Sequence, residues 1–179
     1  MLITTVVVAY ALTNLFATKS YTSNLSKKQV FQFDLETGMS SGEVGPGDSF
    51  DVSPVVYNNA TVDMLVFVKI TMPEYMDDTQ PGSASLRLYT FDASDDWTLV
   101  DTDRGMDVYA YGNGNMSVLA PGESTTALME RMTMKTITNA EYAAIDDINI
   151  TITGYVTGIE NMSMDPAEAW SECKAIGDL

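Results

Sequence analysis

The chain has 179 residues, of which 45% are hydrophobic, and this fits one globular domain with a core of ordinary size. Its 9 basic and 25 acidic residues give a formal net charge of -16, which repels nucleic-acid phosphates and excludes nucleic acid as a partner. Histidine is absent and Cys173 is the single cysteine, so His-based catalytic sets, His-ligated zinc and an internal disulfide are excluded. We therefore predict no catalytic residues and do not expect an enzyme.

An apolar, uncharged segment from Leu2 to Phe16 begins the chain. It is shorter than the roughly 20 residues of a membrane-spanning helix, so no stable membrane span is expected. Two interpretations fit: the core of a signal peptide cleaved near Ala9-Tyr10-Ala11, or a β-strand kept in the mature protein. The β-branched run Thr4–Val8, and the lack of positive charge before Lys19, favour the strand. We divide the chain into an N-terminal apolar strand (1–18), a polar connector (19–28) and a β-sandwich (29–179).

Alternating hydrophobicity predicts antiparallel strands along most of the sandwich. In Val62–Met72 one face is wholly apolar and forms core, and the other, which holds Leu65 and Phe67, is expected to be partly covered. In Ile148–Val156 inward-facing and outward-facing positions alternate. The isoleucines, Gly154 and Val156 are predicted to face inward. The outward positions, expected to face water, are Asn149, Thr151, Thr153 and Tyr155. Further strands are predicted at 29–35, 50–57, 85–91, 97–101, 106–111 and 125–135.

Turn-forming sequences such as Gly45-Pro46-Gly47-Asp48 and Pro81-Gly82 separate these strands. About eight short strands at this spacing predict an all-β fold, a single β-sandwich or jelly roll with few helices. One short helix is predicted after Asp165, which can cap it, with Glu168 closing a capping box. A second is predicted at Asn139–Ala144.

Acidic residues are concentrated between Asp92 and Asp107, where hard cations could in principle find oxygen ligands. The spacing from Asp101 to Asp107 does not match an EF-hand, so we favour solvated charges that block edge pairing. No metal ligands and no cofactor are predicted, and loosely bound calcium stays open. Tyr109 and Tyr111 share a strand face and could form a binding platform, although packing under a neighbouring segment is favoured.

Sequons for N-glycosylation occur five times. In an exported protein they can carry glycans, whereas Thr-rich strands can also create them by accident. Both interpretations stay open. The candidate sites are Asn24, Asn59, Asn115, Asn149 and Asn161.

The order of several short motifs resembles the TasA/camelysin family of exported matrix proteins, which includes relatives among archaeal bundling pilins. The resemblance covers residues 28–171. The motifs that carry it lie at 30–35, 45–48, 52–59, 63–70, 119–126, 150–155 and 165–170.

This resemblance implies a secreted jelly-roll subunit of a cell-surface or biofilm-matrix filament that polymerises with itself, head to tail, by donor-strand complementation. An apolar strand from a neighbour would satisfy the unpaired main chain and apolar surface of an unfilled groove. The family's peptidase label is not supported here, because the usual catalytic zinc sets cannot be built. The alternative is a monomeric cell-surface binding module for carbohydrate or adhesion, using Tyr109 and Tyr111. The expected donor-strand residues are Leu2, Val6, Val8, Tyr10 and Leu12.

Overall fold

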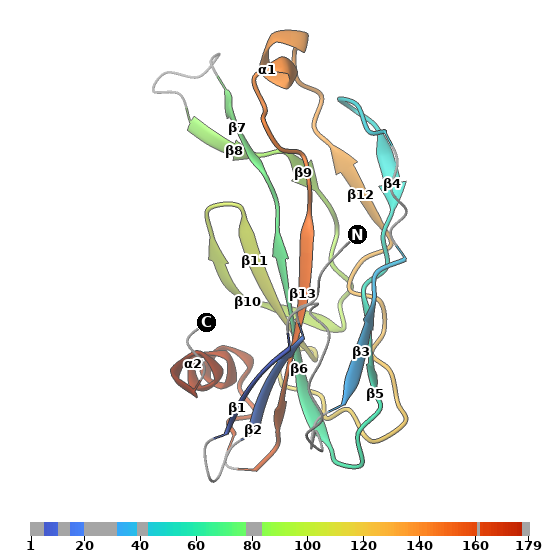
Figure 1. The fold of residues 1–179 in the computed structure, drawn as a ribbon, viewed down its shortest axis with the longest axis vertical. Coiled ribbons are helices and arrows are strands. Elements are labelled where there is room, and N and C mark those ends of the chain that lie inside the picture. Colours follow the sequence, from blue (N-terminus) through green and yellow to red (C-terminus); the bar gives the residue numbers. More distant parts are fainter. Residues whose placement is uncertain are drawn as a thin grey trace.

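The computed structural model describes residues 6–10, 15–19, 32–38, 43–77, 84–160 and 162–176, and it describes 6–10 and 15–19 by their backbone alone. This part of the chain is an elongated all-β structure of antiparallel strands with few, short helices, as Figure 1 shows. The all-β prediction is therefore confirmed.

One six-stranded sheet forms the larger layer of the molecule. Its members, in spatial order, are β1 (Val6–Tyr10), β2 (Leu15–Lys19), β13 (Thr151–Gly158), β6 (Met64–Thr71), β11 (Met106–Tyr111) and β10 (Trp97–Asp103).

Three smaller sheets complete the fold. In Figure 1 two of them lie on the right, facing the six-stranded sheet, and the third extends toward the upper end. They are the pair β3 (Phe33–Glu36) and β5 (Val55–Asn58), the triplet β4 (Ser49–Asp51), β12 (Arg131–Met134) and β9 (Tyr89–Thr90), and the pair β7 (Glu74–Asp77) and β8 (Ala84–Arg87).

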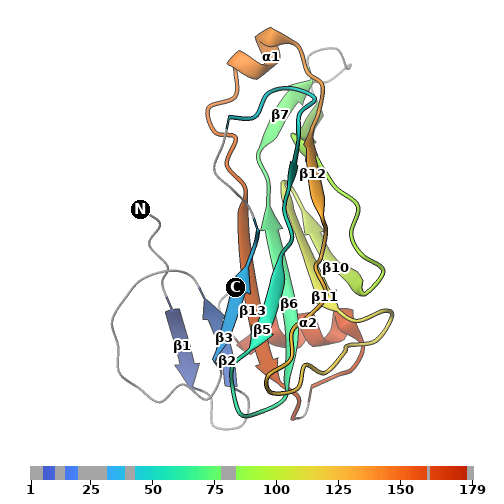
Figure 2. The same cartoon turned by 90° about the vertical axis from the view of Figure 1, so that its right-hand side faces the viewer.

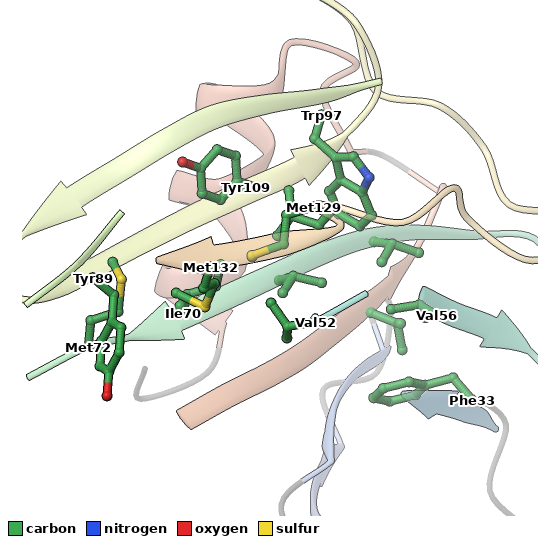
Figure 3. Packing of buried hydrophobic residues seen from close by; sticks show 14 of the residues in the cluster. Phe33, Val52, Val56, Ile70, Met72, Tyr89, Trp97, Tyr109, Met129 and Met132 are labelled. Atoms are coloured by element: carbon green, nitrogen blue, oxygen red, sulfur yellow. The ribbon is translucent and has the colours of Figure 1, made fainter. Parts of the chain in front are cut away.

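The main core lies between the two layers. Figure 3 shows Ile70 of the six-stranded sheet beside Met132 and Val52 of the opposite layer. Tyr109 and Val56 belong to the same cluster. The prediction for Val62–Met72 is confirmed, since the apolar face of β6 is buried in this core.

A second, smaller core covers the other face of the same sheet. Helix α2 (Pro166–Ile176) lies across that face, and its Trp170 ring packs 5.3 Å from Phe67 and 5.6 Å from Tyr155, between centroids. Tyr155 is therefore 3% exposed, and its predicted orientation toward water is wrong. The predicted alternation is present in β13, with Val156 in the main core and Tyr155 in the second core, but the outward face is covered by this helix. Asn149 is exposed, as predicted.

Both helices begin at side-chain caps. Asp165 Oδ1 accepts from the backbone N–H of Ala167 and Glu168, at 3.0 and 2.9 Å. The Glu168 carboxylate bonds to Ser163 Oγ and does not return to the cap, so the predicted capping box is wrong there. A complete capping box forms instead at α1 (Asn139–Ala143), between Thr138 and Glu141.

Cys173 lies on the buried face of α2 and is fully buried. Burial raises the pKa of its thiol to about 12, nearby Glu172 adds to the rise, and the Thr157 hydroxyl opposes it. Cys173 therefore packs within the second core, among the residues that α2 buries against the sheet.

Several predicted strands end earlier or split. Pro54 has no N–H and interrupts the stretch 50–57, so β4 pairs with β12 and β5 pairs with β3. The stretch 85–91 divides at Leu88 into β8 and β9, and only Arg131–Met134 of 125–135 is a strand. The predicted turn at Pro81-Gly82 lies outside the described residues.

A charged side chain joins α2 to the edge strand β10. Asp101 Oδ2 accepts from Trp170 Nε1 and from Lys174 Nζ, both at 2.9 Å. The bond to Lys174, and then the bond to Trp170, lower the pKa of Asp101 below its ordinary 3.8. The carboxylate form therefore stabilises the folded state above pH 3.8, and this contribution is lost as the pH falls through the lowered pKa.

We expect Asp101→Asn to lower the free energy of unfolding by about 1 kcal/mol at neutral pH, because the charge facing Lys174 is lost. Below pH 3.8 the difference from the unchanged protein should shrink, since its Asp101 then becomes protonated as well. Urea denaturation followed by circular dichroism at several pH values measures this. The matched control is Asp51→Asn, whose ion pair with Arg131 is largely exposed. A constant difference down to pH 2 would contradict the assignment.

Candidate assembly interface

Strand β13 is flanked unequally on its two sides. On one side all eight of its residues pair with β6, from Thr151 opposite Thr71 to Gly158 opposite Met64. On the other side β2 pairs with only three of them. These pairs are Tyr155 with Thr18, Val156 with Ala17, and Thr157 with Phe16.

The first half of β13, Thr151–Gly154, thus has no strand partner on the β2 side among the described residues. The inner face of this edge is closed: a Cβ on Gly154 would lie 3.1 Å from Phe33 Cε2. Unpaired main-chain groups at a sheet edge can accept another strand. Among the described residues, this half of β13 is an edge of the sheet on the β2 side.

The N-terminal apolar segment contains two strands rather than one. β1 pairs with β2 antiparallel, from Val6 opposite Lys19 to Tyr10 opposite Leu15, and β1 is the outermost strand of the sheet. This differs from the single strand expected at 1–18, and the strand beside β13 is Leu15–Lys19. Of the predicted donor residues, Val6, Val8 and Tyr10 lie in β1. Leu2, Leu12 and connector residues 20–28 lie outside the described residues.

The acidic residues between Asp92 and Asp107 have two different environments. Asp107 is 4% exposed and forms a bidentate ion pair with Arg87, whose Nη2 lies 2.7 Å from Asp107 Oδ1 and 2.7 Å from Thr102 Oγ1. The interpretation of solvated charge is therefore wrong for Asp107. It holds for Asp92 and Asp95, which are exposed. No group of three metal-ligating side chains occurs among the residues that the structure describes.

Tyr109 and Tyr111 do not form an open platform. Tyr109 is 9% exposed and packs against Phe91, with ring centroids 5.9 Å apart, and Tyr111 is half-buried against Trp97 at 5.1 Å. Burial raises the pKa of Tyr109 to about 12, and Asp107 adds to the rise. The packing interpretation is confirmed.

The three described sequons present exposed asparagines, as a glycan acceptor must. Asn115 lies in a bend of the chain, Asn59 Nδ2 donates to Asp34 Oδ2 at 2.6 Å, and Asn149 Nδ2 donates to Asp147 Oδ1 at 2.5 Å. Asn24 and Asn161 lie outside the described residues.

A pocket of about 550 Å³ lies where α1 approaches β7. Its apolar residues include Tyr75, Met76 and Ile145. Four carboxylates also line it, and none of them takes part in the ion pairs of Arg87, Arg131 and Lys174. These acids are Glu74, Glu141, Asp146 and Asp147. The sequence analysis did not predict this pocket, because β7 lacks clear alternation. The acidic residues that line the pocket are also far apart in the sequence.

Comparisons with known protein families, with curated proteins and with solved structures give no match to this chain. Neither helix of the described ranges has the length and apolar character to cross a membrane.

Proposed function

We propose that this protein is an exported structural subunit that polymerises head to tail with copies of itself into an extracellular filament. The hairpin of β1 and β2 from one subunit would pair along β13 of the next. The observation that carries the proposal is the position of β2, which is joined to the body of the sheet through three residue pairs with β13 alone.

An edge pairing of this kind can be exchanged between copies. The β2–β13 ladder is made of main-chain bonds, so the same residues of a second copy can form it with equal geometry. The contact joins two different surfaces, the hairpin and the β13 edge, and a heterologous contact that does not close generates a filament. Twelve residues, 20–31, link β2 to the region before β3, and an extended chain of this length spans about 40 Å. That reach is sufficient to enter a neighbouring subunit.

The fold and the sequons give further support to the proposal. The two-layer antiparallel arrangement supports a jelly-roll topology, and the exposed sequons support secretion as a glycoprotein. A monomeric binding module based on Tyr109 and Tyr111 has less support, because these rings are packed. The proposal assigns no catalytic role.

A pair of engineered cysteines tests where the hairpin lies. In a Cys173→Ala background, Ala17→Cys and Val156→Cys place thiols on directly opposed residues. Oxidation of assembled protein is expected to give covalent multimers on a non-reducing gel, because the two cysteines come from different subunits. Negative-stain microscopy of the same sample should show filaments.

The matched control combines Ala17→Cys with Glu130→Cys, an exposed residue immediately before β12 in the opposite layer, and should not cross-link. If the first pair gives only an internally cross-linked monomer, and microscopy shows no filaments, then self-assembly through this edge is wrong.

A further inference from the structure

We propose that Asn113 is a site of spontaneous deamidation, and that the Thr98 hydroxyl slows the reaction by binding the backbone N–H of Gly114. Asn113-Gly114 is the single Asn-Gly pair in the sequence. A glycine after asparagine favours deamidation, because it has no Cβ to obstruct the approach of its nitrogen to the asparagine side chain. Such a modification would occur in the folded chain whether or not the chain assembles.

Deamidation begins when the backbone nitrogen of Gly114 attacks Cγ of Asn113. A C–N bond forms, the bond between Cγ and the side-chain nitrogen breaks, and ammonia leaves with the proton of the Gly114 N–H. A succinimide ring remains, and one water molecule opens it at either carbonyl to give aspartate or isoaspartate. Water is the only other reactant. The Gly114 nitrogen must, however, give up its proton and turn toward the asparagine side chain.

The Asn113-Gly114 pair is accessible to this reaction. Both residues are exposed in the loop that follows β11. Gly114 has a φ of +74°, and beyond its chain neighbours a Cβ placed on it would meet no atom of the described residues within 4 Å. The space around the pair therefore admits both the water molecule and the movement of the Asn113 side chain.

Hydrogen bonds to β10 and to the residue before it restrain the backbone of this loop. The Gly114 N–H donates to Thr98 Oγ1 at 3.1 Å, and the same hydroxyl donates to the carbonyl of Gly112 at 2.6 Å. The N–H of Gly112 donates to the carbonyl of Asp96 at 2.7 Å. Figures 1 and 2 show β10 and β11 side by side at one edge of the six-stranded sheet, so the sheet holds Thr98 in place. The nitrogen that must attack Asn113 is therefore engaged as a donor.

Deamidation would change the loop in two ways. A carboxylate would replace the amide and add to the net charge of -16, in a loop that is bonded to the exposed Asp96. Isoaspartate would also add one carbon to the main chain of a tight loop, in which a Cβ on Gly112 would lie 1.9 Å from the carbonyl oxygen of Asn115. The N–H of Met116, the next residue, donates to the carbonyl of Met164 at 2.9 Å. Both changes would weaken this link between β11 and the segment before α2.

The rate of deamidation in the folded protein tests the role of Thr98. Thr98→Val removes the hydroxyl, and the loss of one hydrogen bond of ordinary strength is expected to raise the rate at Asn113 about fivefold. Thr98→Ser keeps a hydroxyl and is the matched control, which should deamidate at the rate of the unchanged protein. Peptide mapping by mass spectrometry, after storage in mildly alkaline buffer, measures aspartate and isoaspartate at each asparagine. The exposed Asn59, which follows β5 in the opposite layer, should be unaffected by either substitution.

Circular dichroism establishes that each variant is folded. Equal rates in Thr98→Val and Thr98→Ser, or faster reaction at another asparagine than at Asn113 in Thr98→Val, would overturn the proposal. If Thr98→Val does not fold, the unchanged protein decides. Its Asn113 is expected to react at least about fivefold faster in denaturing urea than in buffer, because unfolding frees the Gly114 N–H. Equal rates in the two solutions would show that the folded loop does not restrain the reaction.

Discussion

Removal of residues 1–19 is expected to abolish filaments and leave a β-rich monomer of lower stability. The deletion takes away both strands that lie beyond β13, so this strand becomes the open edge of the sheet and no segment remains to enter a neighbour. Burial of one large apolar side chain contributes about 1.5 to 3 kcal/mol before the cost of ordering. Negative-stain microscopy measures the loss of filaments, and urea denaturation followed by circular dichroism measures the loss of stability.

Adding back the deleted residues as a peptide provides the control. The peptide 1–19 should raise the denaturation midpoint of the truncated protein in a concentration-dependent manner, because it binds the folded state at the β13 edge. A peptide with Phe16→Asp and Val8→Asp should not. Normal filaments from the truncated protein would contradict donor-strand assembly and favour the monomeric binding module.

Replacement of Trp170 by alanine is expected to lower the free energy of unfolding by about 3 to 5 kcal/mol. The ring is 4% exposed, fills the space between α2 and the sheet against Phe67 and Tyr155, and donates to Asp101. A cavity at this position would loosen the only helix that covers the outer face among the described residues. Urea denaturation followed by circular dichroism gives the change directly.

Trp170→Phe separates packing from hydrogen bonding. It keeps an aromatic ring in the second core and removes the donor to Asp101, so a loss of about 1 to 2 kcal/mol is expected. If Trp170→Ala costs no more than Trp170→Phe, the ring does not hold the helix to the sheet as described.

A strand could be predicted where the alternation of apolar residues along the sequence shows which side chains face the core. Val62–Met72 could be predicted as a strand because every second residue from Val62 to Met72 is apolar, and this face lies in the main core from Met64 onward. Its other face meets the second core at Leu65 and Phe67. The same reasoning gives β11 its bounds. Alternation cannot say what covers a face, which is why Tyr155 was expected in water although Trp170, distant in the sequence, packs on it.

Other features depend on contacts between distant residues and could not be predicted. The apolar segment near the N-terminus has no strong turn sequence, so nothing marked it as two strands. Arg87 and Asp107 are paired because β8 and β11 approach each other in space. The acidic pocket combines β7 with the segment before β13, and no local pattern connects them.

The position of β6 has a consequence for the time at which the protein can fold. Its two partners in the sheet, β11 and β13, both come later in the chain, and β13 ends only at Gly158. A chain emerging from the ribosome therefore leaves one edge of the eight apolar-rich residues of β6, with high strand propensity, unpaired until β13 has been made. The sheet cannot be completed before β13 has been made, and β2 cannot pair with β13 of the same chain before that point. During this interval a holding chaperone would protect β6 from aggregation.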